Sequence, residues 1–115
     1  MEERVLYLIK KYKSTSPFFI AKEMGIKLII SDMGEVEGCY LQIKKSKFII
    51  LNERLSEQRI TRVMAHELGH AVLHKEIATP HFMSPYCQDC TDEEIEANEF
   101  ADCLLSYRQG ENKGV

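Results

Sequence analysis

The chain has 115 residues, of which 44% are hydrophobic and 29% charged, proportions typical of one globular domain with a single hydrophobic core. No apolar run approaches the ~18 residues of a membrane-spanning helix, and the charged N-terminus lacks a signal-peptide core, so we expect a cytoplasmic protein without membrane contact. In that compartment the four cysteines (Cys39, Cys87, Cys90, Cys103) are expected to be reduced thiols.

Charge is distributed unevenly along the chain. Residues 1–27 carry six basic and three acidic side chains, whereas residues 76–115 carry two basic and nine acidic ones. The acidic part would be repelled by phosphates, so no direct nucleic-acid binding is expected. It would suit a basic protein partner, because opposite fields steer association, although a solvated acidic helix explains the same composition.

The first 24 residues predict two short helices. Apolar residues recur at helical spacing over 3–13, and Ser16 and Pro17 provide an N-cap followed by a proline in the first helical position. Gly25 is expected to end the second helix. Two helices in series are compatible with a helix-turn-helix, but the second carries few side chains that read bases, which disfavours DNA recognition.

Residues 26–51 predict a small sheet. Ile26–Ile30 has the composition of a buried strand, and Gly38–Ile43 and Lys47–Leu51 are expected to form a hairpin around Lys44-Lys45-Ser46. Because sequential strands usually pair, we expect a three-stranded, mostly antiparallel sheet.

The C-terminal half predicts two longer helices separated by a loop. Residues 55–75 carry an apolar stripe at helical spacing, and Asn52 can cap this helix. A loop is expected over 76–91, which holds two prolines and a Cys-x-x-Cys run. A final helix is expected over 92–107, followed by a loose tail over 108–115. The expected fold is a single α+β domain whose sheet packs against these two helices.

The most specific pattern in the chain is His-Glu-Leu-Gly-His at residues 66–70. Positions i and i+4 lie on one face of a helix, so His66 and His70 can bind one zinc ion. Glu67 stands beside them and can accept a proton from the attacking water, as in zinc metalloproteases. The pattern therefore predicts a zinc-dependent peptidase.

A catalytic zinc ion needs a third protein ligand. His74 lies ~12 Å along the helix axis from His66, too far for the two to share an ion. In the final helix, Glu94 lies on a small, apolar face where a buried carboxylate needs a partner. Spacing alone leaves open whether Glu94 binds zinc or reaches back to the Thr91 backbone in a capping box.

Cys87 and Cys90 have the spacing of half a structural zinc site. Cys39 and Cys103 would have to supply the other half, and the chain has no second Cys-x-x-Cys run. We therefore interpret these residues as reduced thiols rather than as a second metal site or a redox pair.

Several blocks of sequence carry a resemblance to a known family: Ser16-Pro17-Phe18, Gly38-Cys39-Tyr40, Ile49-Ile50-Leu51-Asn52, Ala65-His66-Glu67-Leu68-Gly69-His70-Ala71, and Glu94-Ile95-Glu96-Ala97-Asn98-Glu99-Phe100-Ala101. The last two, in this order, are the specific part. With these blocks the chain resembles the ImmA/IrrE family of metallo-endopeptidases over about residues 7–105. The resemblance implies a compact zincin core similar to that of thermolysin.

The resemblance also implies roles for individual residues. It implies one Zn²⁺ per chain, bound by His66, His70 and Glu94, with Glu67 as the catalytic base. Glu96 is the next candidate for the third ligand.

Outside these residues, two supporting roles are expected. Asn98 is expected to orient a ligand through a hydrogen bond. A second donor to the oxyanion is not assigned by the sequence, and His74, His81 and Tyr86 are its candidates.

The resemblance implies a protein substrate, namely a DNA-binding helix-turn-helix repressor of a prophage or mobile element. The alternative is a regulator that binds such a repressor without cutting it and uses zinc only for stability. Glu67 favours the enzyme, because a binding protein has no need of a carboxylate beside the metal.

Overall fold

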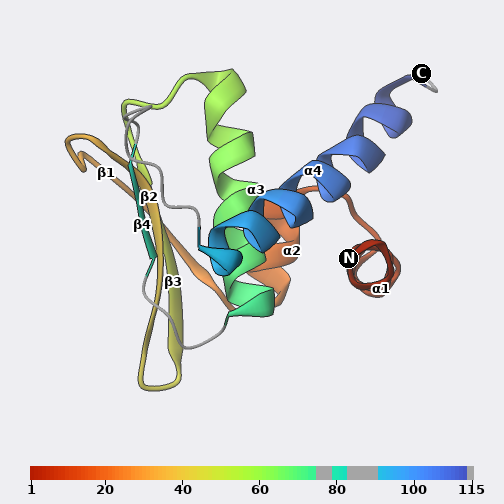
Figure 1. The fold of residues 1–115 in the computed structure, drawn as a ribbon, viewed down its shortest axis with the longest axis horizontal. Helices are drawn as coiled ribbons and strands as arrows, with labels where there is room; N and C mark the ends of the chain where they lie inside the picture. Colours follow the sequence, from red (N-terminus) through yellow and green to blue (C-terminus); the bar gives the residue numbers. More distant parts are fainter. Residues whose placement is uncertain (75–78, 83–90, 114–115) are drawn as a thin grey trace.

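The structure is a computed structural model and describes residues 1–74, 79–82 and 91–113. Its elements, in chain order, are α1 (Glu2–Tyr12), α2 (Pro17–Glu23), β1 (Lys27–Ser31), β2 (Val36–Ile43), β3 (Ser46–Asn52), α3 (Glu57–Leu73), β4 (Thr79–Phe82) and α4 (Asp92–Lys113). Figure 1 shows the sheet as one layer, with α3 beside it and α1 on the side of the helices away from the sheet. The expected α+β class is confirmed.

Side-chain hydroxyls cap the N-termini of three helices, α2, α3 and α4. The Ser16 hydroxyl accepts a hydrogen bond from the Phe19 N–H at 3.3 Å, and Pro17 occupies the first position of α2, as the sequence predicts. After α2, Gly25 adopts a φ of +79°, a conformation that favours glycine.

The N-cap of α3 is Ser56, whose hydroxyl accepts from the Arg59 N–H at 3.1 Å. The expectation that Asn52 caps this helix is wrong. The Asn52 side-chain amide instead donates to the Gly34 and Val36 carbonyls, both at 2.8 Å, and so fixes the connection between β1 and β2.

The sheet has four strands in the order β1-β3-β2-β4. β2 is antiparallel to β3 and β4, whereas β1 runs parallel to β3. The sheet is therefore mostly antiparallel, as expected, but the expectation of three strands is wrong. The fourth strand, β4, lies within the stretch that was expected to be a loop over 76–91.

The first strand also differs from its prediction in its neighbour and its burial. β1 pairs with β3 instead of with the next strand in the chain, so β3, which buries Ile49 and Leu51, lies between β1 and β2. All five residues of β1 are exposed, so the expectation of a buried strand is wrong. β1 is exposed because it is an edge strand with one neighbouring strand, and because α3 packs against β2 and β3.

The last helix is longer than expected. α4 continues to Lys113, so the expectation of a loose tail is wrong for residues 108–113. Gly110 does not end the helix, because a glycine in a helix interior costs only about 1 kcal/mol relative to alanine. In the part of the chain that the structure describes, no helix combines the length and apolar character needed to cross a membrane.

The helix α3 occupies the middle of the molecule, between the sheet and α4 (Figure 1). On its sheet side, Arg59 forms a bidentate ion pair with the buried Glu37 of β2, with distances of 2.5 and 2.8 Å. On its other side Gly69 faces α4, and a Cβ atom there would lie 3.2 Å from the Ala97 Cα and from Phe100. The glycine lets the two helix backbones approach closely, which brings their side chains together at one site.

Candidate metal centre

Two histidines of α3 point into the protein interior. His66 is 2% exposed and His70 is fully buried. Their rings meet edge to face with centroids 4.8 Å apart, and their Nε2 atoms are 3.2 Å apart. The i and i+4 spacing on one helix therefore brings two imidazole nitrogens together, as the sequence predicts for these positions.

Glu94, in the first turn of α4, faces both histidines. Its Oε2 atom lies 2.8 Å from the His66 Nε2, and its Oε1 atom lies 3.0 Å from the His70 Nε2. The Thr91 hydroxyl accepts a hydrogen bond from the Glu94 N–H at 3.3 Å, so Thr91 caps the helix while the Glu94 carboxylate is directed at the histidines.

His66, His70 and Glu94 form the one cluster of potential metal ligands within residues 1–74, 79–82 and 91–113. Zinc ligands at ~2.0–2.1 Å in a tetrahedral arrangement are about 3.3 Å apart. The observed separations of 2.8, 3.0 and 3.2 Å are close to this value. Two imidazole nitrogens and a carboxylate are also a ligand set that suits zinc, so these residues fit the ion.

Glu67 lies between the two histidines on α3 and is fully buried. Burial of a carboxylate is costly unless neighbouring groups or ions compensate its charge. A buried carboxylate next to a group of potential metal ligands is suited to take up and release a proton.

His66 has a second contact on its outer side. Its Nδ1 atom lies 2.8 Å from the Asn98 Oδ1, and Arg62 Nη2 lies 3.5 Å from the same oxygen. Arg62 also pairs with Asp102. The sequence does not predict the pair of Arg62 and Asp102. A signal for it exists, because Arg62 lies four residues before His66 and Asp102 four residues after Asn98, so each shares a helix face with a residue of the contact.

His70 has an outer contact as well. Its Nδ1 atom lies 3.2 Å from the His74 Nδ1, and the His74 Nε2 lies 3.1 Å from Glu96 Oε1. Glu96, the second candidate for the third ligand, is thus placed at His74 and outside the cluster of three. His74, one of the three oxyanion candidates, therefore lies at His70. The second candidate, His81, is in β4, where its backbone lies opposite Gly38 of β2, and the third, Tyr86, lies outside the described residues.

Cys87 and Cys90 likewise lie outside the described residues. Cys39 and Cys103 are half-buried. Burial raises the pKa of the Cys103 thiol, with a smaller contribution from the negative charge of Glu2. Both effects favour the neutral thiol over the thiolate form that binds metal.

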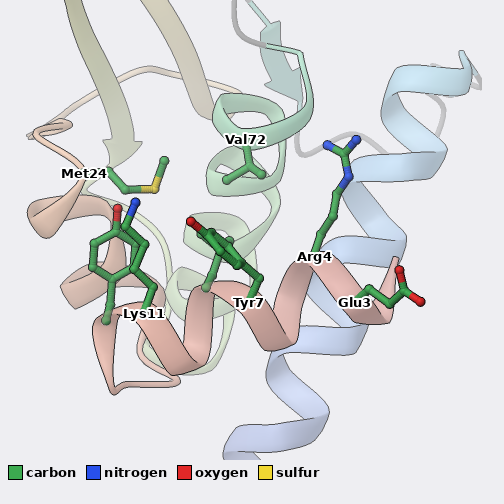
Figure 2. Close-up of a pocket in the computed structure, with 8 residues that line it drawn as sticks. Glu3, Arg4, Tyr7, Lys11, Met24 and Val72 are labelled. Atoms are coloured by element: carbon green, nitrogen blue, oxygen red, sulfur yellow. The ribbon is translucent and has the colours of Figure 1, made fainter.

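A cavity of about 420 Å³ lies along α1, and Figure 2 shows side chains that line it. Its walls combine α1 side chains such as Tyr7 and Lys11 with Val72 of α3 and Met24. A smaller cavity of about 230 Å³ is lined by Arg4, His74 and Glu96, among others. Neither cavity is lined by His66, His70 or Glu94, so the converging side-chain atoms, and not cavity size, define the candidate site.

The sequence comparisons agree with this geometry. A family model named Peptidase_M78 and described as the IrrE N-terminal-like domain matches residues 21–108. An uncharacterized immunity region protein 2 of Bacillus phage phi105 is 41% identical over 100 residues, which cover 85% of this chain and 63% of that protein. The metallopeptidase ImmA of Bacillus subtilis strain 168 is 29% identical over 109 residues, which cover 91% of this chain and 62% of that protein.

The chain thus spans slightly less than two thirds of the length of these two relatives. The match to the family model includes all of the residues that converge at the candidate metal centre. The chain therefore belongs to the family of the IrrE N-terminal-like domain.

Proposed function

We propose that this chain is a zinc-dependent endopeptidase domain. The observation that carries the proposal is the convergence of the His66 Nε2, the His70 Nε2 and the Glu94 carboxylate beside the buried Glu67. The similarity to a protein named metallopeptidase ImmA supports the same activity.

The three clustered residues would hold the metal and leave one position of a tetrahedral site open. Bound zinc supplies Lewis-acid activation of water and of the substrate carbonyl. The ligand-bearing face of α3 lies against α4, so the ligands come from two packed helices and are held in place by the protein core.

Glu67 is the proposed general base. It accepts the proton of the attacking water and then transfers that proton to the leaving amine, which completes hydrolysis of the peptide bond. Its position on α3, one residue after His66 and three before His70, is fixed by the same helix that positions both ligands.

For the substrate we propose a DNA-binding helix-turn-helix repressor of a prophage or mobile element. The similarity to a phage protein whose name refers to an immunity region supports this setting. The acidic composition of residues 76–115 supports a basic partner, because opposite charges accelerate association.

Native mass spectrometry of the purified chain tests the metal. We expect one zinc ion per chain, lost in His66→Ala and in Glu94→Ala. The matched control is Glu99→Ala, which removes an exposed carboxylate from the same helix and should keep the zinc. Zinc that persists in His66→Ala and Glu94→Ala would contradict the proposed site.

Cleavage is tested by incubating the zinc-loaded chain with a proteome-derived peptide library and with purified helix-turn-helix repressors. New N-termini are then counted by mass spectrometry. Glu67→Gln should keep zinc and lose at least about 100-fold in cleavage rate, the typical effect of removing a general base. Zinc binding without any cleavage by the wild type would instead favour the regulator that binds its partner without cutting it.

A further inference from the structure

Beyond the three proposed ligands, His74 and Glu96 form a chain of contacts that ends at His70. We propose that Glu96 and His74 are positioning residues: together they hold the His70 imidazole in the tautomer and orientation that direct its Nε2 atom at the metal. This inference rests on the proposed function, because it concerns how well the same site binds zinc.

The geometry places the three side chains in series. The His70 Nδ1 lies 3.2 Å from the His74 Nδ1, and the His74 Nε2 lies 3.1 Å from Glu96 Oε1. The ring centroids of the two histidines are 5.4 Å apart. The His74 side chain is 10% exposed and that of Glu96 is 50% exposed, so the series runs from the buried cluster out to solvent.

The position of each proton follows from these contacts. A nitrogen that binds a metal carries no proton, so a neutral His70 with its Nε2 at the metal carries its proton on Nδ1. That N–H must donate to the His74 Nδ1, which therefore has to be the unprotonated nitrogen of a neutral His74. The proton of His74 is then on Nε2, where it donates to the Glu96 carboxylate.

Glu96 thus selects the tautomer of His74, and His74 in turn selects the tautomer of His70. Histidine ligands commonly donate their other ring N–H to an outer partner, and loss of such a partner typically lowers metal affinity 10–100-fold. The two proposed histidine ligands have partners of different kinds: the amide of Asn98 lies beside His66, and the His74–Glu96 pair lies beside His70.

The α3–α4 contact that forms the cluster also forms this series. His74 is the C-cap residue of α3, four residues after His70, and Glu96 lies two residues after Glu94 on α4. α4 therefore supplies both the proposed ligand Glu94 and the proposed positioning carboxylate Glu96. The series consists only of residues from α3, its C-cap and α4.

The test measures zinc affinity by competition with a chromogenic chelator, so it does not depend on cleavage. We expect His74→Ala and Glu96→Ala to bind zinc at least tenfold more weakly than the wild type. The matched control Glu99→Ala, which removes the same charge from an exposed position of α4, should stay within twofold. Circular dichroism shows whether each variant is folded.

His74→Asn makes the test specific for the proton relay. An asparagine places its side-chain oxygen near the position of the histidine Nδ1 and accepts the His70 N–H without help from Glu96. We therefore expect His74→Asn to restore affinity to within about threefold of the wild type. In that background, Glu96→Ala should have no further effect. A tenfold loss from Glu96→Ala in the His74→Asn background would overturn the relay.

The outcomes separate this inference from the proposed function. If the wild type binds no zinc, or if His66→Ala binds zinc with the same affinity as the wild type, the proposed function and the relay both fail. If the wild type binds one zinc that His66→Ala abolishes, while His74→Ala and Glu96→Ala stay within twofold of the wild type, the relay alone is wrong.

Discussion

The Nδ1 atom of His66 lies 2.8 Å from the Oδ1 atom of Asn98, so a side chain of α4 reaches the outer side of an α3 histidine whose inner nitrogen faces Glu94. With its Nε2 at a bound metal, His66 would carry its proton on Nδ1 and present it to the asparagine oxygen. Arg62 lies 3.5 Å from this oxygen and pairs with Asp102, so the amide is held between two helices.

This contact predicts that Asn98→Ala weakens zinc binding about 10–100-fold, because His66 loses the acceptor that orients its ring. Asn98→Asp keeps an oxygen at the same position and should bind zinc at least as well as the wild type. Chelator competition measures both affinities. Equal weakening by alanine and aspartate would show that the amide acts through something other than its acceptor oxygen.

Gly69 predicts a packing effect at the contact between α3 and α4. Gly69→Ala would gain about 1 kcal/mol in helix propensity, but the added Cβ would lie 3.2 Å from the Ala97 Cα and from the Phe100 Cβ and Cδ1. Backbone and Cβ atoms cannot rotate away, and overpacking costs about 1–3 kcal/mol. We expect a net loss of about 1 kcal/mol in the free energy of unfolding, measured by urea denaturation with EDTA present.

The exposed Gln58 of α3 offers a control for this measurement, because Gln58→Ala should change the unfolding free energy by less than about 0.5 kcal/mol. Gly69→Ala should also weaken zinc binding, since α4 carries Glu94. A higher free energy of unfolding for Gly69→Ala would show that α3 and α4 can move apart without a cost in stability, which would contradict the close packing at Gly69.

The ion pair between Arg59 and Glu37 predicts a second stability effect. Glu37 is 3% exposed and accepts two hydrogen bonds from Arg59, so Arg59→Met takes a bidentate partner from a buried carboxylate. Because the Arg59 side chain is 48% exposed, solvent screens part of the effect. We expect a loss of about 2 kcal/mol in the free energy of unfolding.

The comparison for Arg59→Met is Arg54→Met, which breaks the exposed pair between Arg54 and Asp32. Exposed pairs contribute about 0–1 kcal/mol. Urea denaturation of both variants should therefore rank Arg59→Met as clearly more destabilised, and an equal effect of the two changes would count against a structural role for the Glu37 contact.

Tyr107 predicts a pH-dependent contact between the two ends of the chain. Its hydroxyl donates to the Glu2 carboxylate at 2.5 Å, and this hydrogen bond, with smaller contributions from burial and negative charge, raises the pKa of Tyr107 from 10.0 to about 12. A raised pKa means that the contact stabilises the fold fully below pH ~10 and loses this contribution as the pH rises toward 12.

Absorbance of the phenolate, titrated from about pH 9 to beyond pH 12, measures this shift, with Tyr107→Phe identifying the signal. Glu2→Gln should return the Tyr107 pKa toward its ordinary value, whereas Glu3→Gln, one residue away, should leave it raised. Identical titration curves for Glu2→Gln and the wild type would refute the contact.

Local rules predicted the features that depend on neighbours in the sequence. The cap at Ser16 and the i, i+4 placement of His66 and His70 depend on hydrogen bonds and spacing within a few residues, so the sequence alone determines them. The hairpin of β2 and β3 belongs to the same class, with Lys44 in the left-handed conformation at its turn.

Three features that the sequence left open or predicted wrongly depend on packing between distant segments. The sequence could not decide whether Glu94 caps its helix or faces the histidines, because the answer depends on how closely α4 approaches α3 at Gly69. The fourth strand and the exposed edge position of β1 were likewise decided by strand pairing across the sheet. A spacing rule fixes which side chains share a face, but only the contact between α3 and α4 brings Glu94, Asn98 and Glu96 to those histidines.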